Sequence, residues 1–146
     1  MKEQVKTSKN SKTIGIIVGI ISAVFSYYFV KKVLLKTDIE TELKSAAIEL
    51  NKQTPLFIDE FSRLDSASTK GKTNFIYHYA LIGIEKSEVN IDTVNKYIRP
   101  GIIENVTNSP ELKFYRDHNI TMDYRYYDEN GDFVMEISVT PEHYRK

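Results

Sequence analysis

The chain has 146 residues, 41% of them hydrophobic, with 20 basic and 20 acidic side chains. This size fits one domain with a small core, and the lack of cysteine excludes a disulfide framework, a thiolate zinc site and a cysteine nucleophile. The charge is divided, because residues 1–36 carry seven lysines and one glutamate whereas residues 37–146 carry thirteen basic and nineteen acidic side chains. An acidic domain repels phosphate, so nucleic acid is not an expected partner.

The first predicted element is a transmembrane anchor at residues 13–36, after a basic N-terminal tail at residues 1–12. Its sequence TIGIIVGIISAVFSYYFV contains no charge, and eighteen helical residues extend about 27 Å. The aromatic run Tyr27–Phe29 precedes Lys31 and Lys32, as is typical of a membrane interface. A cleaved signal peptide has a shorter apolar core and a small-residue cleavage site, and a buried helix would need a second apolar stretch to cover it. We therefore favour an uncleaved anchor.

Lysines flank this anchor on both sides, so the positive-inside rule does not decide its orientation. A short tail needs no translocation, while long domains cross largely regardless of charge. We expect a single-pass protein of the inner (plasma) membrane, with a cytoplasmic N-terminus and an extracytoplasmic domain. Gly15, Gly19 and Ala23 recur every four residues and predict a groove for helix pairing, hence a possible homo-oligomer; the alternative is the ordinary abundance of glycine in membrane helices.

The acidic domain, residues 37–146, begins with an amphipathic helix that Thr54-Pro55 closes. Its inward residues follow helical spacing: Ile39, Leu43, Ala46, Ala47 and Leu50. A hairpin is predicted next, over residues 63–82, with its turn at Gly71-Lys72. In its second arm the alternate residues from Phe75 to Leu81 share one face, and the other face is also mostly apolar. We expect a central strand that is partly covered on both sides.

A second helix is predicted over residues 91–106, with a kink or break at Pro100, and Ser109-Pro110 should begin a short helical turn. The last hairpin gives the clearest local signal, because Asn130-Gly131 is the preferred pair for a two-residue type I′ turn. Folding about this pair makes the numbers of paired residues add to 261. The expected pairs are Met122 with Val139, Asp123 with Ser138, Tyr124 with Ile137, Arg125 with Glu136, and Tyr126 with Met135.

These elements predict the α+β class. After one N-terminal transmembrane helix comes a small two-layer domain in the order helix, hairpin, helix, hairpin. We expect an antiparallel sheet of about four strands with the helices packed on one face.

No motif indicates catalysis. His78, His118 and His143 have no His or Glu partner at a metal-ligand spacing, and a strand histidine between tyrosines is more often a packing residue. The sequence therefore predicts no catalytic residue, no metal ligand and no cofactor.

A candidate partner-binding patch lies in the first hairpin. Arg63 and Asp65 stand two apart on a strand and so face the same way, next to an arm that carries Tyr77 and Tyr79. We interpret these four residues as a polar and aromatic recognition patch. The alternative is a surface ion pair that only helps to set strand register.

The strings LNKQTPLFIDEFSRLDSASTKGKTNFIYHYAL, RPGIIENVTNSPEL and DYRYYDENGDFVMEISVTPEH resemble an uncharacterised family of small bacterial exported or membrane-anchored proteins. The pattern covers roughly residues 45 to 143. It is matched here at Leu50, Asn51, Pro55, Asp59, Arg63, Leu64, Asp65, Gly71, Lys72, Tyr77, Tyr79, Asp128 and Gly131, and it closes with Thr-Pro. The resemblance implies an extracytoplasmic α+β module and supplies no activity. Similar sequences carry cysteines around the positions of Thr107 and His143, which implies a disulfide that this chain lacks.

We expect a noncatalytic single-pass membrane protein whose extracytoplasmic domain binds or helps assemble another cell-envelope component. Its expected partners are the membrane, an unidentified protein and a second copy paired through the transmembrane helix. Two alternatives remain open. One is an immunity or superinfection-exclusion type inhibitor, and the other is an envelope-polymer hydrolase, which would need Asp59 and Asp65 close to His78.

Overall fold

The structure is a computed structural model that describes residues 38–145. The basic tail, the predicted anchor and the predicted pairing residues Gly15, Gly19 and Ala23 lie outside this range. Within it, no helix has the length and apolar character needed to cross a membrane.

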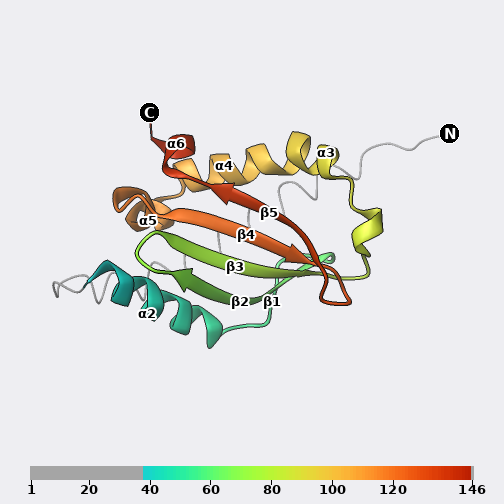
Figure 1. Cartoon of the computed structure of the whole chain (residues 1–146), viewed down its shortest axis with the longest axis horizontal. Coiled ribbons are helices and arrows are strands. Elements are labelled where there is room, and N and C mark those ends of the chain that lie inside the picture. Colours follow the sequence, from blue (N-terminus) through green and yellow to red (C-terminus); the bar gives the residue numbers. More distant parts are fainter. Residues whose placement is uncertain (1–37, 146) are drawn as a thin grey trace.

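The described chain forms an α+β domain around a five-stranded sheet of order β1-β2-β3-β4-β5 (Figure 1). The strands are β1 (Leu56–Phe57), β2 (Ser62–Lys70), β3 (Asn74–Leu81), β4 (Thr121–Tyr127) and β5 (Phe133–Val139). The helical elements are α2 (Ile39–Asn51), η1 (Lys86–Glu88), α3 (Ile91–Thr93), η2 (Val94–Ile98), α4 (Arg99–Asn108), η3 (Pro110–Leu112), α5 (Lys113–Asp117) and α6 (Pro141–Tyr144). Helices α2 and α4 lie along opposite edges of the sheet (Figure 1).

Helix α2 forms where the apolar spacing predicts it. Its inner side buries Leu43 and Leu50, whereas on its outer side Lys44 pairs with Glu40 at 2.6 Å. The helix ends at Asn51, four residues before Pro55, and the Thr54–Pro55 peptide bond is cis. One buried side and one solvated side are typical of a helix that packs on the core with its other side in solvent.

The side-chain amide of Asn51 pairs with the backbone of β2. Its Nδ2 donates to the Ala67 carbonyl at 2.9 Å, and its Oδ1 accepts from the Ala67 amide at 2.6 Å. Strand β1 pairs only with Arg63 and Leu64, so Ala67 lies where no described strand covers that side of β2. The amide therefore supplies the two hydrogen bonds that a neighbouring strand would make there.

The predicted hairpin of β2 and β3 is confirmed, with its turn at Gly71-Lys72. The strands pair antiparallel from Lys70 and Asn74 onward, and a bulge interrupts the register between Leu64 and Ser66. Gly71 has φ +53°, a conformation that glycine adopts without a steric penalty.

The expectation of a fully antiparallel sheet is wrong at its centre, where β3 and β4 pair in parallel. Phe75 lies beside Met122 in this register, and Tyr77 lies beside Tyr124. Residues 82–120 leave the end of β3 and return through the helices to the start of β4, so the two strands run in the same direction (Figure 1). Such a long helical crossover is the connection that parallel neighbours require. Strand β1 makes five strands in place of the expected four.

The crossover helix is not divided at Pro100. Residues Val94–Ile98 form a π-helical turn directly before α4, and Pro100 occupies the first turn of α4. A wider turn accommodates the missing proline amide. Val106 is fully buried, whereas Ile91 and Ile98 are 43% and 47% exposed, so the first half of the crossover helix contacts the core mainly through Val94.

The hairpin of β4 and β5 has the predicted register, and all five expected pairs from Met122–Val139 to Tyr126–Met135 are confirmed. The predicted turn type is wrong. Gly131 has φ +85° but Asn130 does not have a positive φ, as a type I′ turn requires at both positions. The loop instead closes between Asp128 and Asp132, and an irregularity after Tyr126 restores the register along the strands.

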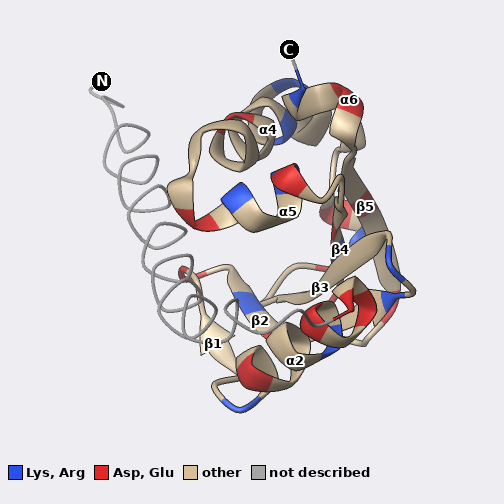
Figure 2. Cartoon of the chain, turned by 90° about the vertical axis from the view of Figure 1, so that its left-hand side faces the viewer, with Lys and Arg blue, Asp and Glu red and all other residues tan. Residues whose placement is uncertain are grey.

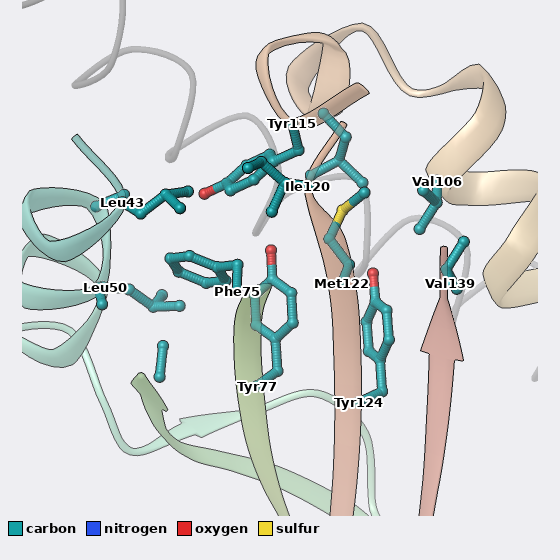
Figure 3. Close-up of a cluster of buried hydrophobic side chains, with 14 of the residues drawn as sticks. Leu43, Leu50, Phe75, Tyr77, Val106, Tyr115, Ile120, Met122, Tyr124 and Val139 are labelled. Carbon is teal, nitrogen blue, oxygen red and sulfur yellow. The ribbon is translucent and has the colours of Figure 1, made fainter. Parts of the chain in front are cut away.

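The core lies between one face of the sheet and the helices α2, α4 and α5, and Figure 3 shows side chains from these elements meeting there. Phe75 is fully buried, with its ring centroid 5.0 Å from that of Tyr77 and 5.2 Å from that of Tyr115. Tyr77 stacks on Tyr124 at 5.0 Å. Burial raises the pKa of all three of these tyrosines well above the ordinary value, so they are neutral at physiological pH.

The other face of the sheet, which we call the open face, is set apart from this core because the described helices pack on the opposite side. It carries mostly polar side chains: Ser66, Ser68, Asn74, His78, Asp123, Arg125, Tyr127, Glu136 and Ser138. Ile76 also points to this face and is only 6% exposed, although it is not part of the core cluster. The sequence predicts that β3 is partly covered on both of its faces. On the open face this cover comes from neighbouring side chains of the sheet.

Candidate functional site

One row of side chains crosses all five strands on the open face, near the ends of β3 and β4. The register places these residues side by side in the order Phe57, Arg63, Ala80, Tyr127, Phe133. The Arg63 guanidinium lies 5.8 Å from the centre of the Phe57 ring, and the Tyr127 and Phe133 ring centroids are 5.9 Å apart. We call this set the cross-strand row.

The centre of the cross-strand row is hollow, because Ala80 has only a methyl group between the larger Arg63 and Tyr127. A recess of about 360 Å³ lies there, which we call the Ala80 recess. It is lined by Arg63, Asp65, Ser66, His78, Tyr79, Ala80, Tyr127, Asp128 and Glu129. Strands β2, β3 and β4 and the loop after β4 therefore contribute to a single depression on the open face.

Arg63 and Asp65 form one wall of the recess. The guanidinium donates to both carboxylate oxygens, with Nε–Oδ1 at 2.5 Å and Nη2–Oδ2 at 3.1 Å. The Asp65 carboxylate raises the pKa of Arg63 further above its ordinary value. About a third of each side chain is exposed, and surface pairs of this kind contribute only about 0–1 kcal/mol to stability. The pair therefore orients two charged groups at the recess more than it stabilises the fold.

His78 lies on the floor of the recess. Its Nε2 is 2.7 Å from Ser68 Oγ, and its Nδ1 is 3.4 Å from the Tyr127 hydroxyl. Partial burial, and then the positive charge of Arg125, lower the pKa of His78, which favours the neutral ring. A serine hydroxyl against a neutral imidazole is the contact of a nucleophile with its base. At the other ring nitrogen, however, there is a tyrosine hydroxyl and not the carboxylate that orients the base in a serine hydrolase.

The loop after β4 forms the far wall. Asp128 Oδ1 accepts from the amides of Asn130 and Asp132, both at 2.9 Å, and its Oδ2 accepts from the Lys86 amide at 3.2 Å. These backbone hydrogen bonds lower the pKa of Asp128, and the one from Asp132 has the largest effect. They tie the hairpin loop to η1, so this wall is held in place while Glu129 stays exposed at the rim.

Another hydrogen-bonded network crosses β3, β4 and β5 on the open face. The buried Asp123 carboxylate accepts from Asn74 Nδ2 at 2.7 Å and from Ser138 Oγ at 2.6 Å. Beside it, Arg125 pairs with Glu136, as the sequence register predicts. The network ties the three strands together beneath the open face through side chains as well as through their backbones.

The four residues of the predicted partner-binding patch do not share one surface. Arg63 and Asp65 line the Ala80 recess, but Tyr77 is only 6% exposed and lies in the core. Tyr79 borders the recess, while its ring stacks against Tyr126 at 5.2 Å among the core aromatics. Neighbouring strands alternate their faces together, so residues 77 and 79 point away from residue 63.

Sequence reasoning missed Ala80 and Tyr127, which complete the recess, and Phe57 and Phe133, which end the cross-strand row. The known turn positions give the β2–β3 and β4–β5 registers. The parallel register that brings Ala80 beside Tyr127 has no local signal in the sequence. Of the residues considered for a hydrolase, Asp65 and His78 line the recess, whereas Asp59 does not and instead accepts from the Phe61 amide at 2.8 Å.

A second recess, of about 440 Å³, lies between α4 and α6. Thr107 and His143 both line it, so the two places around which the family resemblance implies a disulfide belong to one local surface. Across residues 38–145, no group of three His, Asp or Glu side chains is placed to hold a metal ion. Figure 2 shows acidic and basic residues interspersed over the helices on the side of the domain that it presents.

Solved structures share this fold. A candidate secreted protein from Pseudomonas aeruginosa has 13% identity and a TM-score of 0.58, over 76% of this chain and 100% of its own. A type II secretion system pilotin from Vibrio cholerae has 15% identity and a TM-score of 0.53, over 72% of this chain and 91% of its own. The type 2 secretion system pilotin of Vibrio vulnificus has 10% identity and a TM-score of 0.52, over 74% of this chain and 93% of its own. At these identities the likeness establishes the fold alone.

No curated protein matches the sequence. A family model described as a domain of unknown function (DUF8479) matches residues 37–135, which is more than half of the chain. The chain therefore belongs to the DUF8479 family.

Proposed function

We propose that this chain is a noncatalytic protein of the cell envelope, anchored in the inner (plasma) membrane by residues 13–36, whose domain binds another protein of the envelope. The observation that carries the proposal is the open face. It presents two exposed phenylalanines, Phe57 at 68% and Phe133 at 48%, on either side of an ordered polar recess. Exposed aromatic side chains around a well-ordered centre are a common composition of protein interfaces.

Two further findings support this proposal. The solved structures with the same fold include two type II secretion system pilotins and a candidate secreted protein. The sequence before the domain has the length and composition of a membrane anchor, with a basic tail in front of it. The noncatalytic part of the proposal is supported by the tyrosine that replaces an orienting carboxylate beside His78.

The partner is tested by formaldehyde crosslinking in living cells that produce the tagged full-length chain. Membranes are solubilised, the chain is purified, and adducts are identified by mass spectrometry. We expect one dominant adduct with an envelope protein, absent from a strain that produces an unrelated anchored domain with the same tag. Recovery of the chain without any specific adduct would contradict a binding function.

Location is tested with a single introduced thiol. The chain contains no cysteine, so Asn130→Cys, at an exposed position in the β4–β5 loop, provides the only thiol in the protein. We expect a membrane-impermeant maleimide to label this variant in spheroplasts, and the protein to stay in the pellet after carbonate extraction. Labelling only after lysis would reverse the orientation, and release by carbonate would remove the anchor.

A further inference from the structure

We propose that the cross-strand row is the docking surface for a protein segment that places apolar side chains on Phe57 and Phe133 and a lysine or arginine in the Ala80 recess. This inference rests on the proposed function and specifies the surface and the chemistry of the partner.

The size of the row sets the length of the bound segment. Phe57 and Phe133 lie on the two outermost strands and are separated by four inter-strand steps, which is about 19 Å at 4.8 Å per step. A segment that contacts both rings must therefore run across the strands. About thirteen residues of helix span that distance, or about six residues of extended chain.

Charge selects a cation for the recess. The charged side chains on or next to its lining are three cations, Arg63, Lys86 and Arg125, and five carboxylates, those of Asp65, Asp128, Glu129, Asp132 and Glu136. Arg125 and Glu136 pair with each other. Arg63 is already engaged by Asp65, and Asp128 by three backbone amides. Glu129 and Asp132 are exposed and form no ion pair with any residue in the described range. The recess therefore favours a positively charged side chain of the partner, bound next to Glu129.

The aromatic ring of Tyr127 also favours a cationic side chain in the recess. Tyr127 borders the recess, and its ring contacts both the His78 ring at 6.0 Å and the Phe133 ring at 5.9 Å. A cation over the face of such a ring is attracted by its π-electrons, and the attraction is stronger when water is excluded. An apolar residue next to the cation would meanwhile cover Phe133, which is half exposed in the unbound chain.

The row is already ordered before binding. Its side chains project from paired strands, the Arg63 fork is held by Asp65, and the far wall is held by the hydrogen bonds of Asp128. Binding therefore requires little ordering of this chain, and that lowers its entropic cost.

The test places a photocrosslinking phenylalanine analogue, p-benzoylphenylalanine, in the full-length chain in its membrane. It replaces Phe57 or Phe133 in two variants, and in two control variants it replaces Ile48 or Tyr97, which are 58% and 66% exposed elsewhere on the domain. We expect adducts with one protein from positions 57 and 133, at least about fivefold above the control positions, because crosslinking requires close contact within the interface. Mass spectrometry should place the attachment in a segment that holds an apolar residue and a lysine or arginine.

A second arm tests the charge. Glu129→Lys combined with Asp132→Lys should lower the adduct yield at Phe133 by about fivefold or more, because the recess then repels a cation. Glu104→Lys, at an exposed acid on α4, should leave the yield unchanged. Circular dichroism of each purified variant confirms that it is folded.

The outcomes are distinguishable. Adducts only from positions 48 or 97 overturn the docking surface and leave the proposed function standing. Adducts with lipid or glycan, or a yield that the two lysines do not change, overturn the assigned partner chemistry. No adduct at any of the four positions, together with none in the formaldehyde experiment, overturns both proposals.

Discussion

The two faces of the sheet use the same strands in different ways. On the helix-covered face, Phe75, Tyr77 and Tyr124 interlock with residues from α2 and α5, and hydrophobic burial stabilises the domain. On the open face, side chains of the sheet cover one another, so that Ile76 is 6% exposed without a described helix above it. The comparison shows that an apolar residue in a strand pattern indicates burial, but not whether another layer or its own neighbours provide the cover.

A difference in composition follows from this. On the covered face, large buried side chains pack against one another without a gap in the cluster. On the open face, the cross-strand row has large side chains at both ends and the small Ala80 between them. The first arrangement fills space for stability, and the second leaves space that a partner can fill. Four tests separate these roles, from the largest expected effect to the smallest.

Matched phenylalanine deletions give the largest contrast. Phe75→Ala removes a fully buried ring and should lower the free energy of unfolding by about 3–5 kcal/mol, since the cavity cannot close. Phe133→Ala, at a ring that is 48% exposed, should cost less than about 1 kcal/mol. Urea unfolding of the full-length protein in mild detergent, followed by circular dichroism, measures both. Equal losses would show that the open face also carries the stability of the fold.

Matched aspartates test the polar network. Asp123→Ala leaves the Asn74 amide and the Ser138 hydroxyl without their buried acceptor, and we expect a loss of about 1–3 kcal/mol. Asp65→Ala breaks an exposed ion pair and should change the unfolding free energy by less than about 1 kcal/mol. The same urea experiment applies. A loss at Asp65 as large as that at Asp123 would mean that the recess wall is a structural element.

Matched glycines test the wall of the recess. Gly131→Ala forces a side chain into φ +85° and should cost about 1–2 kcal/mol, although a Cβ there meets no other atom within 4 Å. Gly101→Ala, in α4 and equally uncrowded, should be neutral or stabilising by up to about 1 kcal/mol. Thermal unfolding resolves the two directions. A neutral Gly131→Ala would contradict a rigid hairpin loop.

The smallest effect concerns His78. Its pKa is lowered in the folded chain, so below the unfolded value of about 6.5 the unfolded state binds more protons and the folded state loses stability. The contribution of neutral His78 to the stability of the folded state is complete above pH 7.5. It declines as the pH falls through 6.5 toward the lowered pKa of the folded state. Unfolding free energies of the wild type and His78→Gln at pH 8, 7.5, 6.5 and 5.5 measure it. We expect the difference in unfolding free energy between the two proteins to be constant from pH 8 to 7.5. Below pH 7.5 the wild type should lose stability relative to His78→Gln. A difference that stays constant at all four pH values would refute the assignment.

Local sequence information predicted the local pairings. Gly71-Lys72 and Asn130-Gly131 located both hairpins, and the register of β4 and β5 was confirmed pair by pair. The choice of turn type was wrong because a bulge lets a longer loop join the same paired strands. The parallel contact of β3 and β4 was missed because alternation identifies the faces of a strand but not its neighbour, which depends on the path of residues 82–120.

The candidate site shows the same limit. Arg63 and Asp65 were selected correctly as neighbours on one strand, since their spacing alone puts them together. Tyr79 and Ala80 are adjacent in sequence but point to opposite faces, and only Ala80 has its side chain beside Tyr127 on the open face. A small residue attracts no attention in a sequence, and its role as the floor of a recess depends on the larger residues that the register places around it.

The Asn51 amide on Ala67 has a consequence for how copies of this chain coexist in a crowded compartment. Beyond the two residues of β1, the margin of β2 offers unpaired backbone groups on which a foreign strand could assemble. The amide occupies those groups at the centre of the margin, so that intermolecular strand addition and the growth of ordered aggregates are blocked there by a single side chain. The asparagine of the Leu-Asn-x-x-x-Pro pattern thereby takes the place of a neighbouring strand at this margin.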